Sequence, residues 1–167
     1  MLADGLLRAA NARAKARRWA PWSNMALRRG DDVTATRERL VLRLVLDGWQ
    51  PDARLSLNGR RRNQWPVVRR LQQEAKDYVG WRVLWGWALG QVASEATGPR
   101  HVTVTFVYPN RRRRDLDNLA GMAKPCLDAL VDAGLLVDDD AEHCALTIAV
   151  RVEVGRRATE IRVVEVE

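Results

Sequence analysis

The stretch that organises this chain is RRRRDLDNLAGMAKPCLDALVDAGLLVDDD, residues 111–140. It opens with four arginines and continues with two aspartates, Asp115 and Asp117, separated only by Leu116. A lone lysine, Lys124, follows, and three adjacent aspartates close the stretch at residues 138–140. Basic and acidic groups are therefore concentrated in one segment, and the rest of the chain is interpreted around it.

Asp115 and Asp117 have the spacing of a carboxylate pair. In an extended segment alternate side chains leave the backbone on the same face, so the two carboxylates would repel each other without a cation. Mg²⁺ is held by one or two carboxylates together with a phosphate oxygen and water, and Mn²⁺ is a possible substitute. The arginines before the pair would attract that phosphate; they are Arg111, Arg112, Arg113 and Arg114. The pattern predicts metal-assisted chemistry on a phosphodiester.

The return of a third carboxylate depends on the helix that follows. One helix over residues 119–133 would carry the chain roughly 22 Å, whereas the segment from Gly134 to Asp139 spans at most about 17 Å. A helix that begins at Pro125 would be shortened to roughly 13 Å and would let Asp139 rejoin Asp117. If the helix instead runs through Pro125 with a kink, the third carboxylate comes from beside the sheet or from a second subunit.

Taken together, these spaced elements resemble the RusA family of Holliday junction resolvases. The matching residues are Asp115, Asp117, Asn118, Lys124, Asp128, Gly134, Asp138 and Asp139. The resemblance covers roughly residues 40–167 and is dense over 111–140. It implies a Mg²⁺-dependent homodimer that cuts four-way DNA junctions symmetrically. It further implies Asp115, Asp117 and Asp139 as the essential acidic residues and metal ligands, and Lys124 as the catalytic lysine.

The spacing departs from the family pattern at one place. In the family the lysine follows the aspartate pair more closely, at the position that Gly121 occupies here. A three-residue insertion accounts for the later position of Lys124, which matches the family when counted back from Asp128. Asp138 and Asp140 remain alternatives to Asp139, because spacing alone does not choose among three adjacent carboxylates. We expect Asn118 to brace the metal loop and Asp138 to support the site.

Calcium binding and helix capping are the simpler roles that acidic residues in this pattern could have. A calcium loop of the EF-hand type would need glycine at the sixth position from Asp115 and glutamate at the twelfth, where the chain has Ala120 and Cys126. That type of site is excluded. Helix capping by Asp117 or Asn118 accounts for one residue of the first cluster, but it leaves the arginine run unexplained.

Composition indicates an anionic partner in a reducing compartment. The chain has 167 residues, a net charge of +7 and a sequence pI of about 10.4, and three of its 28 basic residues are lysine. Arginine is favoured for bidentate recognition of phosphate, so nucleic acid is the expected partner. Two cysteines are too few for a disulfide framework, and no stretch approaches the length of a membrane span. We therefore expect a cytoplasmic protein that binds nucleic acid, and the resemblance to RusA resolvases implies branched DNA.

Hydrophobic periodicity predicts one α+β domain over residues 37–167, preceded by a basic N-terminal extension over residues 1–36. Strands are expected at 40–46 and 101–108, and a hairpin is expected between 143–154 and 160–166. A helix that Pro66 opens should break at Gly80 before a second helical segment. With the helix after Asp117, the order is β-α-β-α-β-β, a mixed sheet with helices packed on it.

Two features outside the central stretch are further candidates for DNA contact. A polar loop from Pro51 to Gln64 carries a turn signal at Asn58-Gly59, followed by Arg60, Arg61 and Arg62, which either bind phosphate or are simply solvated. The tryptophans at 81, 85 and 87 either stack on exposed bases or, as we favour, pack in the core or a dimer interface.

Three functions are compatible with these patterns. The first is a Mg²⁺-dependent endonuclease that resolves four-way DNA junctions, in which two coordinated cuts require a symmetric dimer. The second is a non-catalytic basic nucleic-acid-binding protein whose carboxylates are structural. The third is a nuclease that acts on flaps, forks or RNA.

Overall fold

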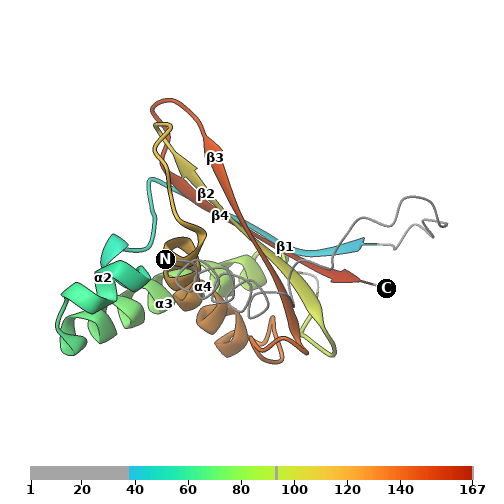
Figure 1. Cartoon of the computed structure of the whole chain (residues 1–167). Helices are drawn as coiled ribbons and strands as arrows, with labels where there is room; N and C mark the ends of the chain where they lie inside the picture. The colour runs from blue at the N-terminus through green and yellow to red at the C-terminus, as the bar shows by residue number, and fades with distance from the viewer. Residues whose placement is uncertain (1–37, 93, 167) are drawn as a thin grey trace, which may run out of the picture. The chain divides into compact units, whose positions relative to one another are not determined.

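The computed structural model describes residues 38–92 and 94–166 of the chain. A four-stranded mixed sheet in the order β1-β4-β2-β3 carries helices α3 and α4 (Figure 1). In chain order the elements are β1 (Glu38–Asp47), the 3-10 helix η1 (Ala53–Leu55), α2 (Leu57–Arg62), α3 (Trp65–Ala88), β2 (Arg100–Tyr108), α4 (Leu116–Asp132), β3 (Cys144–Val152) and β4 (Ala158–Val166). The predicted α+β class and the order β-α-β-α-β-β are confirmed. The predicted basic extension, residues 1–36, lies outside the described residues.

Strand β2 shows the predicted alternation as far as Phe106, after which Val107 is also buried. Val102, Val104 and Phe106 are fully buried, whereas the intervening His101 and Thr103 are partly exposed. Strand β2 pairs in parallel with β3 on one side and antiparallel with β4 on the other. The strand that leads into the arginine run is therefore held from both sides, which fixes the start of the acidic segment.

The predicted hairpin between β3 and β4 is wrong. Strand β4 pairs antiparallel with both β1 and β2, so β2 separates β3 from β4 in the sheet. Burial explains the difference, because Ile161, Val163 and Val164 of β4 are buried, whereas Leu146 and Val150 of β3 are about 40% exposed. The more apolar strand takes a central place, and the chain crosses the end of β2 to reach it.

Helix α3 runs without a break through Gly80, contrary to the prediction. A glycine inside a helix costs about 1 kcal/mol relative to alanine, but Val79 and Val83 on either side of it are fully buried. Their burial outweighs the local cost of Gly80.

The predicted polar loop at 51–64 is also wrong in part, because η1 and α2 lie within it. Ser56 caps the first turn of α2 by accepting a hydrogen bond from the Gly59 amide at 3.0 Å.

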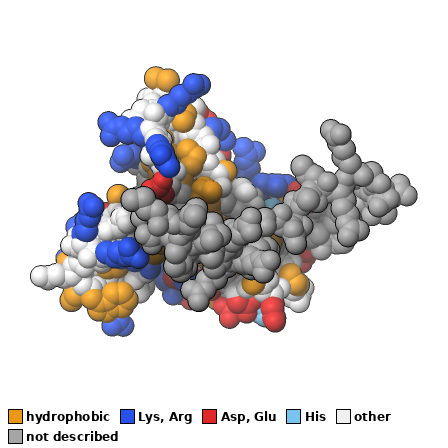
Figure 2. Space-filling model, in the orientation of Figure 1, with side chains coloured by type: hydrophobic (Ala, Val, Ile, Leu, Met, Phe, Trp, Pro, Cys, Tyr) orange, Lys and Arg blue, Asp and Glu red, His pale blue; other side chains and the backbone are white. Residues whose placement is uncertain are grey.

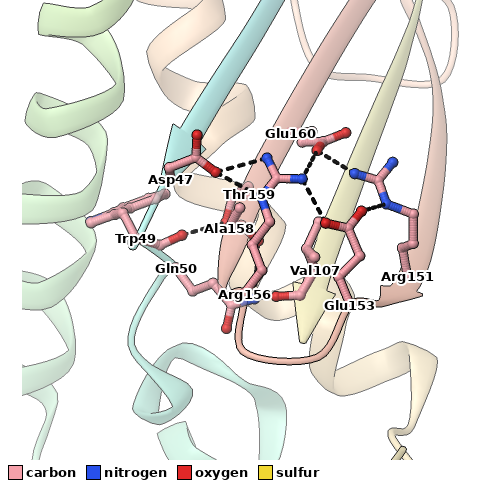
Figure 3. Close-up of polar contacts among 10 residues, drawn as sticks. All are labelled: Asp47, Trp49, Gln50, Val107, Arg151, Glu153, Arg156, Ala158, Thr159 and Glu160. Carbon is pink, nitrogen blue, oxygen red and sulfur yellow. Dashed lines mark hydrogen bonds and ion pairs between the residues drawn. The ribbon is translucent and has the colours of Figure 1, made fainter. Parts of the chain in front are cut away.

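An ion-pair network fastens the connection between β3 and β4 to the end of β1 (Figure 3). Arg156 contacts Asp47 at 2.7 Å and Glu153 at 2.8 Å, and Arg151 contacts Glu153 at 2.6 Å. Glu160 of β4 forms ion pairs with both arginines. The network joins three strands at the sheet end from which the arginine run departs.

No helix among the described residues combines the length and the apolar character needed to cross a membrane. Cys126 and Cys144 are both free and buried.

Candidate active site

The acidic pair lies at the start of helix α4. Asp115 is the residue before the helix, with an extended backbone, and Asp117 lies in the first helical turn. The expectation that both aspartates share one extended segment is therefore wrong, because the helix begins between them at Leu116. A carboxylate in this position is stabilised by the exposed amide groups and the dipole of the helix N-terminus.

The pair lines a pocket together with arginines. This acidic pocket has a volume of about 480 Å³. Its lining residues are Leu57, Asn58, Arg61, Arg113, Arg114, Asp115, Leu116, Asp117 and Asn118. Arg113 lies 3.9 Å from Asp115, and both side chains are largely exposed. Two carboxylates and several guanidinium groups thus meet at one solvent-accessible place.

Helix α2 is held against α4 by a hydrogen bond that Pro125 makes possible. Helix α4 runs through Pro125, as the second alternative expected, and a proline there has no amide to donate to the carbonyl of Gly121. Arg60 supplies the missing donor, because its Nη2 donates to the Gly121 oxygen at 3.1 Å. Its Nε donates to the Leu55 oxygen at 2.8 Å. Arg60 is therefore used within the fold, whereas Arg61 and Arg62 are exposed.

The close approach of α4 to the end of η1 and the start of α2 also requires glycine at position 121. A Cβ atom there would lie 2.8 Å from the Leu55 oxygen, which is closer than real Cβ atoms come. The Asn118 side chain makes a second link, because its Oδ1 accepts from the Asn58 amide at 3.2 Å. Asn118 thus braces the acidic loop against α2, and a lysine could not take the place of Gly121 without moving this contact.

Lys124 is the meeting point of two carboxylates. Its Nζ contacts Asp128 at 2.9 Å and makes a short contact with Asp139. Burial acts to lower the pKa of Lys124, but the hydrogen bonds that Lys124 donates to Asp139 and Asp128 outweigh it, so the pKa is raised above the ordinary lysine value. Lys124 is consequently a fixed cation at neutral pH.

The three adjacent aspartates have different partners. Asp139 faces Lys124, with 21% of its side chain exposed. Asp138 accepts from the amide of Asp139 at 2.7 Å, and Asp140 accepts from the amides of Glu142 and His143. The hydrogen bonds from His143 hold the pKa of Asp140 below its usual range. Asp138 and Asp140 shape the turn, so Asp139 is the aspartate of the three that faces α4.

Asp139 returns to α4 but not to the acidic pair. Lys124, its partner, lies seven residues after Asp117, which is about 10 Å further along a helix and on the same side of it. Among the residues that the structure describes, no group of three or more His, Cys, Asp or Glu side chains is arranged to hold a metal ion. Because the helix continues through Pro125, the loop that follows it brings Asp139 back to Lys124 and not to Asp117. This agrees with the length estimate for a continuous helix.

The arginine run divides by role. Arg114 lies with its guanidinium carbon 3.5 Å from the centre of the Tyr108 ring, and it donates to the oxygens of Arg112 and Asn110. Arg114 therefore shapes the loop as well as charging it. The side chains of 111–113 are exposed. Lys and Arg side chains are spread over the upper and left parts of the face in Figure 2, and acidic ones gather at its lower right.

The tryptophans of α3 differ in burial. Trp81 is 72% exposed and Trp85 is 64% exposed, whereas Trp87 packs partly against the core. Core packing therefore holds for Trp87 alone among these three, and packing of Trp81 and Trp85 in a dimer interface stays a prediction. Asp132, which the sequence predicts to face solvent or a basic partner, pairs with Lys76 at 2.6 Å.

Comparison of the sequence with models of known protein families gave no match, and comparison with curated proteins gave none.

Proposed function

We propose that the protein is a Mg²⁺-dependent endonuclease that resolves four-way DNA junctions, as the resemblance to RusA resolvases implies. The observation that carries the proposal is the acidic pocket, where Asp115 and Asp117 lie beside Arg61 and Arg113. Carboxylates without neighbouring cations would repel a polyanion, and arginines without carboxylates would hold no metal. Their combination suits a phosphodiester substrate.

The residues present fit a magnesium ion held by the smallest usual set of protein ligands. Two exposed carboxylates that line one pocket, with room for water and a phosphate oxygen, are sufficient ligands for this ion. Asp115 and Asp117 would hold it. When bound, it would activate water and stabilise charge on the scissile phosphate and the departing oxygen.

Asp139 enters the proposal through Lys124. Asp139 and Asp128 together favour the protonated form of the Lys124 ammonium group and hold it in place. Lys124 and Asp117 are seven residues apart and so lie on the same face of α4. Lys124 lies about 10 Å along α4 from Asp117 and is paired with two carboxylates, so its catalytic role, which the resemblance implies, stays a prediction. Asp139 is thus a positioning residue for Lys124, and its role as a third metal ligand remains a prediction.

The remaining residues would bind the DNA backbone. Arg61, Arg62 and the exposed arginines at 111–113 would contact phosphates without reading sequence, so affinity would fall steeply with salt. Two cuts placed symmetrically on a two-fold junction require two sites, so a homodimer is part of the proposal. We place the protein in the cytoplasm, where DNA and reduced cysteines coexist.

A synthetic four-way junction tests the function. We expect the wild-type protein to bind and cut the junction with Mg²⁺, and Asp117→Asn to bind it with comparable affinity and cut at least about 100-fold more slowly, as losses of charged transition-state stabilisers do. The control variant is Asp132→Asn, because Asp132 lies on the same helix but pairs with Lys76. Binding without cleavage by the wild type would instead identify a non-catalytic nucleic-acid-binding protein.

Substrate choice separates the remaining alternative. Fork, flap, linear duplex and RNA substrates of the same sequence are compared with the junction under identical salt. Preferential cutting of the junction supports the resolvase, whereas equal cutting of linear duplex would exclude junction selectivity.

A further inference from the structure

A second and larger cavity adjoins the acidic pocket. This aromatic pocket has a volume of about 780 Å³, within the usual range for small-ligand sites. It is lined by Trp49, Gln50, Pro51, Asp52, Ala53, Leu71, Glu74, Ala75, Tyr78, Tyr108, Arg114, Met122 and Arg157. Arg114 lines both cavities, so a ligand in the aromatic pocket would lie one side chain away from the acidic pair.

The lining of the aromatic pocket has an apolar floor and aromatic walls. Leu71, Ala75 and Met122 are each less than 10% exposed. Trp49 and Tyr78 stack on each other with ring centres 4.9 Å apart, and Tyr78 is still 38% exposed. Such surfaces accept a flat, aromatic group, because stacking on an aromatic side chain tolerates any base.

Gln50 adds a directional hydrogen-bonding group. Its Nε2 donates to the oxygens of Val107 at 2.7 Å and Ala158 at 3.1 Å, as Figure 3 shows. The amide is thereby fixed, and its Oε1 accepts no hydrogen bond from the residues that the structure describes. A fixed acceptor in the lining suits an exocyclic amino group of a nucleobase.

Positive charge at the aromatic pocket indicates a ligand that carries phosphate. Arg157 is exposed and forms no side-chain hydrogen bond or ion pair with the described residues. Arg114 contributes a second guanidinium that the Tyr108 ring holds in place. Burial raises the pKa of Tyr108 against the lowering effect of Arg114, so its phenol stays protonated at neutral pH.

We propose that the aromatic pocket receives an unstacked nucleobase from the DNA strand whose phosphate lies at the acidic pocket. The inference rests on the proposed function and extends it to how the site selects its position on the strand. Bases next to a branch point cost least to unstack, so a site that holds one favours branched over linear DNA. Gln50 would further favour a base that carries an amino group over one that does not.

The test uses a four-way junction with 2-aminopurine beside the crossover and the Asp117→Asn protein, which we expect to cut it at least about 100-fold more slowly than the wild type. Binding should change the emission of the 2-aminopurine, because the base leaves its stack. Tyr78→Leu and Arg157→Ala should each remove most of that change and weaken binding about tenfold, the scale of one lost base stack. Trp65→Leu and Arg82→Ala are the matched controls, since both residues are exposed on α3 and line neither pocket.

The outcomes separate the two proposals. Equal emission changes in the pocket variants and the controls, with the junction bound and cut by the wild type, would overturn this inference and leave the nuclease standing. No binding of the junction by any protein would overturn both. If Tyr78→Leu fails to fold, Arg157→Ala decides alone, because Arg157 is exposed and takes no part in the core.

Discussion

Lys124 is the residue whose surroundings most directly define the acidic side of α4. Two carboxylates from different places in the chain converge on it, Asp128 from the next helical turn and Asp139 from the loop after the helix. Their charges favour the protonated lysine more strongly than its partial burial disfavours it. Lys124 thereby ties the loop after α4 to the helix, and it is the fixed cation of the proposed site.

We predict that Asp139→Asn lowers the pKa of Lys124, because one of the two anions that stabilise its charge is removed. The raised pKa contributes stability that is complete below the unfolded-state value and is lost as pH rises through the folded-state value. Side-chain NMR titration can follow this directly, since the chain has three lysines, Lys15, Lys76 and Lys124. Asp132→Asn is the control, because Asp132 pairs with Lys76. An unchanged Lys124 titration in Asp139→Asn would show that the contact does not persist in solution.

Two helical glycines provide opposite predictions for the same substitution. Gly121→Ala places a Cβ 2.8 Å from the Leu55 oxygen, so we expect a loss of about 1–3 kcal/mol in the free energy of unfolding. Gly80→Ala meets no atom within 4 Å in the middle of α3, so we expect a gain of about 0.5–1 kcal/mol. Urea unfolding of the two variants measures both. Equal effects would contradict the close approach of α2 to α4.

At the scale of elements, Pro125 explains how α2 is held. It leaves the Gly121 oxygen without a helical donor, and the Arg60 guanidinium takes that place. We predict that Arg60→Ala costs less in a Pro125→Ala protein, where the restored amide can bond the Gly121 oxygen. A double-mutant cycle by urea unfolding should give a coupling of about 1 kcal/mol, the scale of one hydrogen bond. Additive effects of the two substitutions would show that the two residues do not share this carbonyl.

The sheet order makes a prediction that differs from a simple hairpin. Strand β4 is paired on both sides, whereas β3 pairs with β2 alone among the described strands. We expect the β4 amides to exchange with solvent more slowly than those of β3, and we expect cross-strand NOEs between Val104 and Ile161. NOEs between β3 and β4 instead would restore the hairpin.

For the whole molecule, local patterns predicted elements well and partners poorly. The alternation of 101–108 identified β2 because buried residues alternate with partly exposed ones as far as Phe106. The same kind of alternation in 143–154 identified β3 but suggested the wrong neighbour. Strand pairing depends on which strand buries both faces, and a period of two residues does not carry that information.

The candidate site was also predicted in part: the sequence identified its residues but not all of their contacts. The sequence identified Asp115, Asp117 and Lys124 as residues of one segment, and a length estimate showed that a continuous helix would keep Asp139 from the pair. It could not show that Arg60 completes α4, because that contact joins residues 61 positions apart. The signal available was Pro125 itself, which predicts an unpaired carbonyl four residues earlier.

The claim that the start of α4 holds the divalent cation is tested most directly by the binding of Mn²⁺, followed through the relaxation of solvent water protons. We predict that the wild-type protein binds Mn²⁺, that Asp115→Asn and Asp117→Asn each weaken this binding at least about tenfold, and that Asp138→Asn, which alters the turn beside Lys124, leaves it unchanged. Unaltered Mn²⁺ binding in both Asp115→Asn and Asp117→Asn would contradict a cation site at the start of α4.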